Sequence, residues 1–134
     1  MNTTKNIQTV QQIYADFGAG NVSGIMNSIS DDVVWVDAGY PDLPYGSTGR
    51  SKKDIPAFFK SLNESVDYKK FEPKEFIADG NSVIVLGYHE GNTKPANKSF
   101  GQEWVMVWKL DDSGKVKYYR SFLDTNELVK AYKN

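Results

Sequence analysis

Apolar residues recur at helical spacing in three segments of the first half of the chain. The first stripe ends at the glycine-rich run of residues 18–20, where glycine supplies the backbone freedom that a helix end needs. Asn21 has the side chain of an N-cap for a second, short helix. Ser51 can cap a third helix, which we expect to begin near Asp54 because Pro56 fits only in a first helical turn. The three stripes consist of Ile7, Val10, Ile13, Tyr14 and Phe17; of Val22, Ile25, Met26 and Ile29; and of Ile55, Phe58, Phe59 and Leu62.

The remaining pattern is that of strands. Residues 31–36, DDVVWV, form a short β-branched and aromatic run that is typical of a strand. Connections of hairpin length predict that the strands of the second half pair in antiparallel fashion. Pro73 predicts an edge position or a bulge, and apolar residues on both faces of residues 103–110 predict that both faces are covered. The strands expected in the second half span residues 68–78, 82–91, 98–110 and 115–123.

The chain closes with a short helical segment, NELVKAY, for which Asp124 and Glu127 form a capping-box pair. The resulting order is helix, helix, strand, helix, a meander of four strands, and a last helix. This order predicts an α+β fold in which helices lie on a strongly curved antiparallel sheet. A length of 134 residues with 40% hydrophobic side chains fits one domain over residues 1–134.

Composition narrows the function classes further. Sixteen basic and seventeen acidic residues give a net charge of −1, so no overall field favours nucleic acid or an anionic membrane. The absence of cysteine fits a reducing compartment, the N-terminal segment MNTTKNIQTVQQ is too polar for a signal peptide, and no apolar run has the length of a membrane span. We therefore expect a cytoplasmic protein. One histidine without cysteine is a poor metal site, and no phosphate-binding glycine motif occurs, so we expect no metal and no cofactor.

Four segments occur in an informative order: VQQIYADFGAGN, GNVSGIMNSISDDVVWVD, PYGSTGRSKKDIPAFF and GKVKYYRSFLDTNELVKAY. Together they resemble the SnoaL-like, ketosteroid-isomerase-related branch of the nuclear transport factor 2-like (NTF2-like) superfamily, over nearly the whole chain. The resemblance implies a cone-shaped, cystatin/NTF2-like roll, in which a curved sheet and helices close an apolar cavity, often in a homodimer. Together with the apolar residues on both faces of residues 103–110, it predicts that this chain forms a homodimer. Its members include isomerases, polyketide cyclases, epoxide hydrolases, dehydratases and proteins without catalytic activity, so the fold leaves the function open.

The same resemblance implies roles for two residues. In ketosteroid isomerases a strand ends in an aspartate that shuttles a proton beside a carbonyl. That aspartate follows a pair of aspartates at the same sequence spacing as Asp37 follows Asp31 and Asp32. Tyr14 falls where those enzymes keep a tyrosine that donates to the developing oxyanion. Met106 replaces their third group, a protonated aspartic acid, and losing one oxyanion donor typically costs about a hundredfold or more in rate. Steroid isomerase activity is therefore not expected.

Each candidate catalytic residue also has a purely structural interpretation. Asp37 can be a solvated strand-end residue that opens a turn, and Tyr14 can be a core aromatic with its hydroxyl at the rim. His89, the only histidine, can be a satisfied surface or core residue. Asp124 matches an acid in the ending motif of the family, but its role as an N-cap explains it equally well.

Three functional hypotheses follow. In the first, a small apolar molecule that bears a carbonyl enters the cavity, Asp37 moves a proton, and Tyr14 or His89 stabilises the oxygen. The second is a ligand-binding or dimerisation domain without chemistry. The third is an epoxide-hydrolase-like use of Arg120 and Asp124, which requires both in the cavity. We expect the cavity lining to include Trp35, Phe58, Phe59, Met106, Trp108 and Tyr119.

Overall fold

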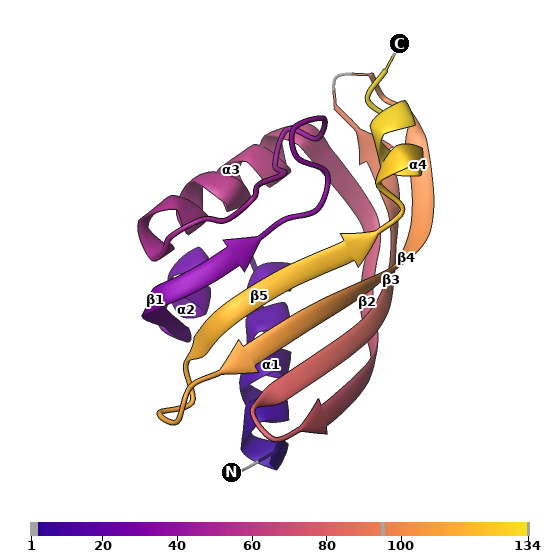
Figure 1. The fold of residues 1–134 in the computed structure, drawn as a ribbon. Helices are drawn as coiled ribbons and strands as arrows, with labels where there is room; N and C mark the ends of the chain where they lie inside the picture. Colours follow the sequence, from indigo (N-terminus) through magenta and orange to yellow (C-terminus); the bar gives the residue numbers. More distant parts are fainter. Residues whose placement is uncertain (1–2, 95, 134) are drawn as a thin grey trace.

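The structure, a computed structural model, describes residues 3–94 and 96–133. Five strands form one curved, open sheet, and α1, α2 and α3 lie together on one side of it (Figure 1). The predicted α+β fold is therefore confirmed. The elements are α1 (Thr3–Gly18), α2 (Val22–Met26), β1 (Ile29–Val36), a 3₁₀ turn η1 (Lys52–Asp54), α3 (Ile55–Ser65), β2 (Val66–Asp79), β3 (Ser82–Thr93), β4 (Ser99–Leu110), β5 (Val116–Leu123) and α4 (Thr125–Lys130).

The strand order is β1-β5-β4-β3-β2, and the predicted antiparallel meander runs from β2 to β5. β1 departs from the prediction of an antiparallel sheet, because it pairs with β5 in parallel, with Trp35 opposite Tyr119. No hairpin joins these two strands, since α3 and the strands β2 to β4 lie between them in the chain, so no short connection imposes an antiparallel direction.

Element boundaries differ from the predicted ones where a strand competes with a helix. Ile29 was expected on the second helix, but α2 ends at Met26 and Ile29 pairs with Val116 as the first residue of β1. A spacing of four residues from Ile25 fits a helix, yet pairing with β5 outweighs that local pattern. Pro73 lies in the edge strand β2 beside a register shift, so its predicted position is confirmed.

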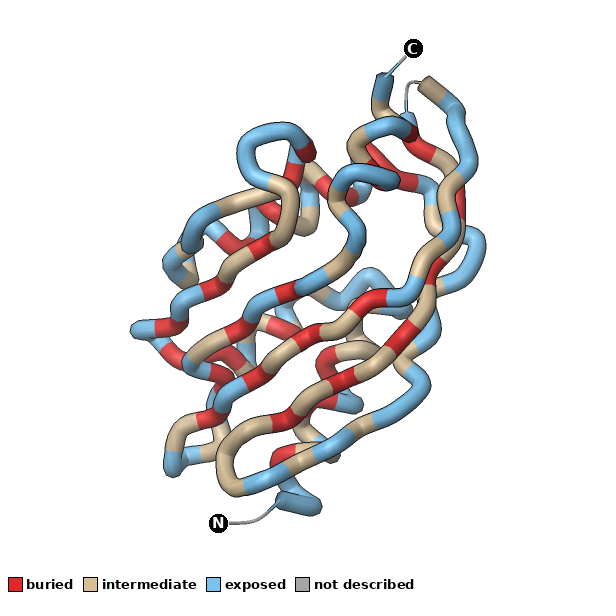
Figure 2. Tube along the Cα trace, turned by 45° about the vertical axis from the view of Figure 1, so that its right-hand side comes forward, coloured by how far each residue is buried: buried red, intermediate tan, exposed pale blue. Residues whose placement is uncertain are grey.

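Burial alternates along the strands, as Figure 2 shows. On β4, Trp104, Met106, Trp108 and Leu110 are buried, whereas residues 103, 105, 107 and 109 of the opposite face are half-buried or exposed. Within one chain the described residues therefore leave that outer face uncovered, so its predicted covering would have to come from outside the chain. Its covering by a second copy of the chain stays a prediction. Among the described segments, no helix is long and apolar enough to cross a membrane.

One close contact in the sheet depends on glycine. Gly87 of β3 lies directly opposite Trp104 of β4. A Cβ atom placed on Gly87 would lie 2.2 Å from the Trp104 indole, which is closer than real Cβ contacts occur. The indole is 2% exposed and stacks against Tyr14 and Phe71, at centroid distances of 5.8 and 5.1 Å. Glycine at position 87 thus makes the room for this tryptophan.

Candidate active site

The loop that follows β1 brings a basic side chain back to the strand end. Trp35 and Arg50 form an isolated antiparallel bridge, in which the Trp35 N–H donates to the Arg50 carbonyl over 3.1 Å. The Arg50 N–H donates in return to the Trp35 carbonyl over 2.7 Å. Because the bridge is two residues before Asp37, it holds the Arg50 guanidinium beside that carboxylate.

Asp37, at the tip of β1, is only 3% exposed, so its carboxylate depends on protein donors. Trp35 Nε1 donates to Asp37 Oδ1 over 3.1 Å, and Arg50 Nε donates to Asp37 Oδ2 over 3.2 Å. The Ser47 hydroxyl lies 3.5 Å from Oδ2 and accepts from the Asp37 backbone N–H at 3.2 Å. These contacts fix the orientation of the carboxylate, and they exclude the predicted alternative of a solvated strand-end aspartate.

Burial and these donors act on the acidity of Asp37 in opposite directions. Burial is the larger influence and raises the pKa of Asp37 to about 7, although the Arg50 charge and the hydrogen bonds from Trp35, Arg50 and Ser47 lower it. The carboxyl group therefore exchanges its proton near neutral pH. A buried acid with this property at a cavity wall is a typical functional-site candidate.

Asp37 lies on the wall of a cavity of about 70 Å³. Tyr14 and His89 lie on the same wall, and of the described lining residues Asp37 alone is a carboxylic acid. Most of the other side chains are aliphatic or aromatic and come from the helices and from the inner face of the sheet. The lining also includes Trp35, Phe58, Phe59, Met106, Trp108 and Tyr119.

Tyr14 takes part in two hydrogen bonds through its hydroxyl. Trp108 Nε1 donates to the Tyr14 oxygen over 3.0 Å, and the Tyr14 hydroxyl donates to Met106 Sδ over 3.1 Å. Burial raises the pKa of Tyr14 well above its usual range, so the hydroxyl keeps its proton. A thioether is a weak acceptor. The hydroxyl can therefore turn to a stronger acceptor, such as a ligand oxygen, at small cost.

His89 is 2% exposed, and its Nε2 lies 3.0 Å from Gln102 Oε1. Burial lowers the pKa of His89, although the bond to Gln102 acts in the opposite direction. The imidazole is therefore neutral near neutral pH. Its Nδ1 is buried and has no partner among the described residues.

Two of the candidates lie away from the cavity. Asp124 is exposed, and its carboxylate accepts from the Glu127 N–H over 3.2 Å, which makes it the N-cap of α4. Arg120 is exposed and places its guanidinium over the ring of Phe122, 5.1 Å from the centroid. Neither residue lines the cavity, so the epoxide-hydrolase-like hypothesis is wrong for these residues.

Sequence reasoning missed Arg50, Ser47 and Gln102. Arg50 and Ser47 belong to the turn-rich loop, where no periodicity shows which side chain points inward. Gln102 lies directly opposite His89 in the pairing of β3 with β4, so an exact hairpin register would have been needed to find it.

Comparison with known proteins agrees with the fold. Residues 10–119 match the family model described as SnoaL-like domain. An NTF2-like protein from Burkholderia xenovorans LB400 is 30% identical in sequence and has a TM-score of 0.89, with 99% of each chain covered. TerC, co-crystallised with polyporic acid, is 24% identical and has a TM-score of 0.85, with 97% of this chain and 99% of that chain covered. At that level of identity the likeness to TerC concerns the fold alone.

A partial match connects the chain to a much longer protein. The CWF19-like protein 2 homolog of Drosophila melanogaster is 35% identical over 78 residues, which are 58% of this chain. The chain spans about a tenth of the length of that curated relative, since the match covers 10% of it.

Proposed function

Because the chain belongs to the family of SnoaL-like domains, we propose that it binds a small, largely apolar, carbonyl-bearing molecule and moves a proton at a carbon beside the carbonyl. The observation that carries this proposal is Asp37, a buried carboxylic acid on an otherwise apolar wall, whose pKa of about 7 suits a general base. A base of this strength accepts a proton and returns it at similar cost near neutral pH.

The polar groups of the cavity wall have different roles in this proposed reaction. Asp37 takes a proton from carbon, the electron pair of the C–H bond moves toward the carbonyl oxygen, and Tyr14 donates a hydrogen bond to that oxygen. The Trp108 N–H, which donates to Tyr14, polarises the hydroxyl further. Asp37 then returns the proton to the same carbon or to a conjugated one, so that the ligand is isomerised or exchanges hydrogen with water.

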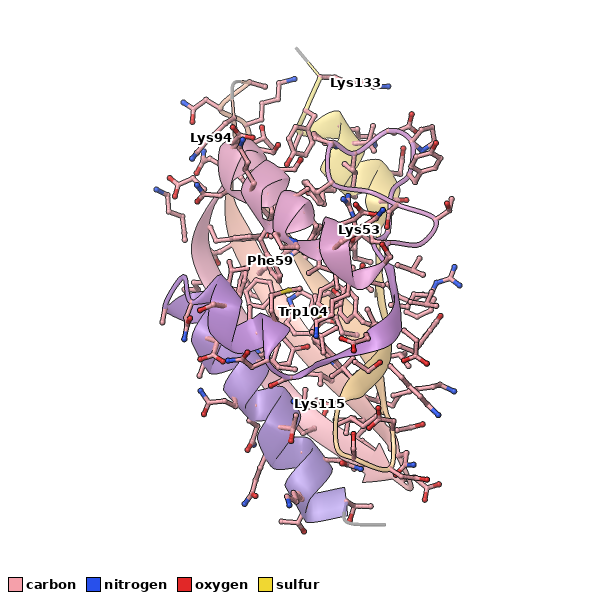
Figure 3. The ribbon with its side chains drawn as sticks, turned by 90° about the vertical axis from the view of Figure 1, so that its left-hand side faces the viewer. Lys53, Phe59, Lys94, Trp104, Lys115 and Lys133 are labelled. Atoms are coloured by element: carbon pink, nitrogen blue, oxygen red, sulfur yellow. The ribbon has the colours of Figure 1, made fainter. Side chains whose placement is uncertain are left out.

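The size of the cavity sets a condition on binding. Its volume of about 70 Å³ is below the roughly 150 Å³ of a cavity known to hold benzene, so a ring-sized ligand enters only when lining side chains shift. A surface groove between the helices and β2 shares seven side chains with the cavity: Tyr14, Phe17, Ile25, Phe59, Leu62, Tyr68 and Phe71. Figure 3 looks on to this side of the molecule and labels Phe59 of α3. We take this shared wall as the entrance.

The structure of TerC with polyporic acid supports the expectation that this fold accepts organic molecules. It does not identify the ligand of this chain, because the two proteins are only 24% identical.

Hydrogen–deuterium exchange into 2-tetralone tests the proposal, since this apolar ketone carries acidic hydrogens beside its carbonyl. We expect the protein to accelerate the exchange in D₂O at pD 7, followed by ¹H NMR. Asp37→Asn should lower the protein-catalysed rate by about a hundredfold or more, because general base catalysis contributes that much.

Asp31→Asn is the matched control, since it removes the same charge from a side chain that is fully exposed. It should retain the rate. A protein that binds 2-tetralone without accelerating exchange, or an Asp37→Asn variant with an unchanged rate, would contradict the proposal. Either result would favour the alternative, a ligand-binding domain without chemistry.

A further inference from the structure

A chain of hydrogen bonds fixes which nitrogen of His89 carries the proton. Gln102 Nε2 lies 2.9 Å from the backbone carbonyl oxygen of Asp124. A carbonyl oxygen only accepts, so the amide NH₂ group of Gln102 must face it. The Gln102 oxygen then faces His89, 3.0 Å from Nε2, and this oxygen also only accepts. Nε2 therefore carries the hydrogen of the neutral ring.

In this tautomer Nδ1 of His89 is a hydrogen-bond acceptor without a donor. The atom is buried and has no partner in the described part of the chain. A buried polar atom without a partner costs free energy, so a hydrogen-bond donor brought by a ligand would be stabilised at this atom. Trp104 Nε1 is also buried without a partner, but Trp104 does not line the cavity, whereas His89 does.

The surroundings of the imidazole restrict the kind of group that fits there. Tyr68, Phe71 and Phe100 surround the ring, at centroid distances of 5.5, 6.1 and 5.3 Å. A neutral hydroxyl carried on a flat, apolar ring suits such a site better than an ammonium group does, because a charged group would lose its hydration there.

We propose that Nδ1 of His89 accepts a hydrogen bond from a hydroxyl group of the ligand, which makes the substrate class a hydroxylated aromatic or enolic carbonyl compound. This inference rests on the proposed function in placing the ligand in the same cavity. Tyr14 then donates to the carbonyl oxygen while His89 accepts from the hydroxyl. The two residues have opposite polarity, so together they fix which end of the ligand reaches Asp37. His89 thus determines specificity and does not stabilise the oxyanion.

A pair of ligands that differ in one group tests the hydroxyl site. In 4-hydroxyacetophenone and 4-methylacetophenone the carbonyl is identical, and a hydroxyl replaces a methyl group of similar size. We expect the protein to bind the hydroxyl compound about tenfold more tightly in NMR titrations, because it satisfies the buried acceptor. His89→Phe keeps an aromatic ring but has no acceptor, so it should bind the two compounds equally.

The tautomer is tested separately, without turnover. Since His89 is the only histidine, ¹⁵N-histidine labelling gives the signals of one imidazole. We expect long-range ¹H–¹⁵N spectra at pH 7 to show Nε2 protonated and Nδ1 bare, and the Nδ1 signal to shift when 4-hydroxyacetophenone binds. A proton on Nδ1, or a hydroxyl preference that survives in His89→Phe, would overturn the proposal.

The same titrations on Asp37→Asn separate this inference from the proposed proton transfer. If Asp37 is not a base but His89 selects hydroxyl groups, exchange into 2-tetralone fails and the tenfold preference remains in both proteins. If the hydroxyl site is wrong, the preference is missing although exchange proceeds.

Discussion

Asp37→Asn should gain stability relative to the unsubstituted protein as the pH rises from about 4 to about 7, by about 4 kcal/mol. Burial raises the pKa of Asp37 from 3.8 to about 7. Between these values the native carboxyl keeps its proton while the unfolded one has lost it. The native state then binds more protons than the unfolded state, so the stability of the unsubstituted protein falls as the pH rises through this window. Asparagine does not titrate, so the stability of the variant does not fall in this way as the pH rises.

Urea denaturation of both proteins at several pH values between 4 and 8 measures this effect. Asparagine also changes the contact with the Arg50 side chain, which is 17% exposed. While the native carboxyl is protonated, Arg50 faces a neutral group in both proteins, so this contact adds an offset that changes little with pH. The informative quantity is thus how the difference in the free energy of unfolding between the two proteins changes with pH. Asp31→Asn reports the removal of an exposed charge. A difference between Asp37→Asn and the unsubstituted protein that stays flat from pH 4 to 8 would show that Asp37 is an ordinary acid.

Gly87→Ala should destabilise the protein by about 3 kcal/mol, near the upper end of what overpacking in a core costs. The added methyl group would lie 2.2 Å from the Trp104 indole. The indole cannot swing into solvent, because it is 2% exposed and stacks against Tyr14 and Phe71. Either the tryptophan leaves its position or the two strands separate, and both lose packing around the cavity wall. Urea denaturation at a fixed pH measures the cost.

Gly18→Ala is the matched control, since nothing lies within 4 Å of a Cβ atom at that position. It should change the free energy of unfolding by well under the cost at Gly87. A double-mutant cycle with Trp104→Leu identifies the cause, because a smaller side chain at position 104 should relieve most of the cost of the Gly87→Ala substitution. If the penalty of Gly87→Ala is the same with tryptophan and with leucine, the indole is not what the glycine accommodates.

The fold was largely predictable because most of it is encoded in local patterns. The helical stripes, the hairpin turns of the meander and the Asp124 cap all rest on residues close in sequence. Ile29 and the direction of β1 were not predictable in this way, since both depend on pairing with Val116 and the rest of β5. Such pairing leaves no periodic signal in the residues themselves.

In the candidate site, too, some residues could be found from the sequence and others depend on long-range pairing. Asp37 and Tyr14 were found through the order of motifs, and His89 because it is the only histidine. The partners that orient these side chains could not be found from the sequence. The loop after β1 returns Arg50 to Asp37, and the register of β3 and β4 places Gln102 opposite His89. In both cases the decisive partner is fixed by backbone pairing over a distance, not by spacing.

The parallel pairing of β1 with β5 has a consequence for how the protein folds. The hairpins of the meander join neighbouring segments, whereas Trp35 must find Tyr119 across most of the chain, so we expect this pairing to form late. Asp37 stands at the end of β1 and becomes buried only when that strand has docked. At neutral pH the native carboxyl, whose pKa is about 7, is about half protonated, so we expect the docking of β1 to be accompanied by a partial uptake of a proton.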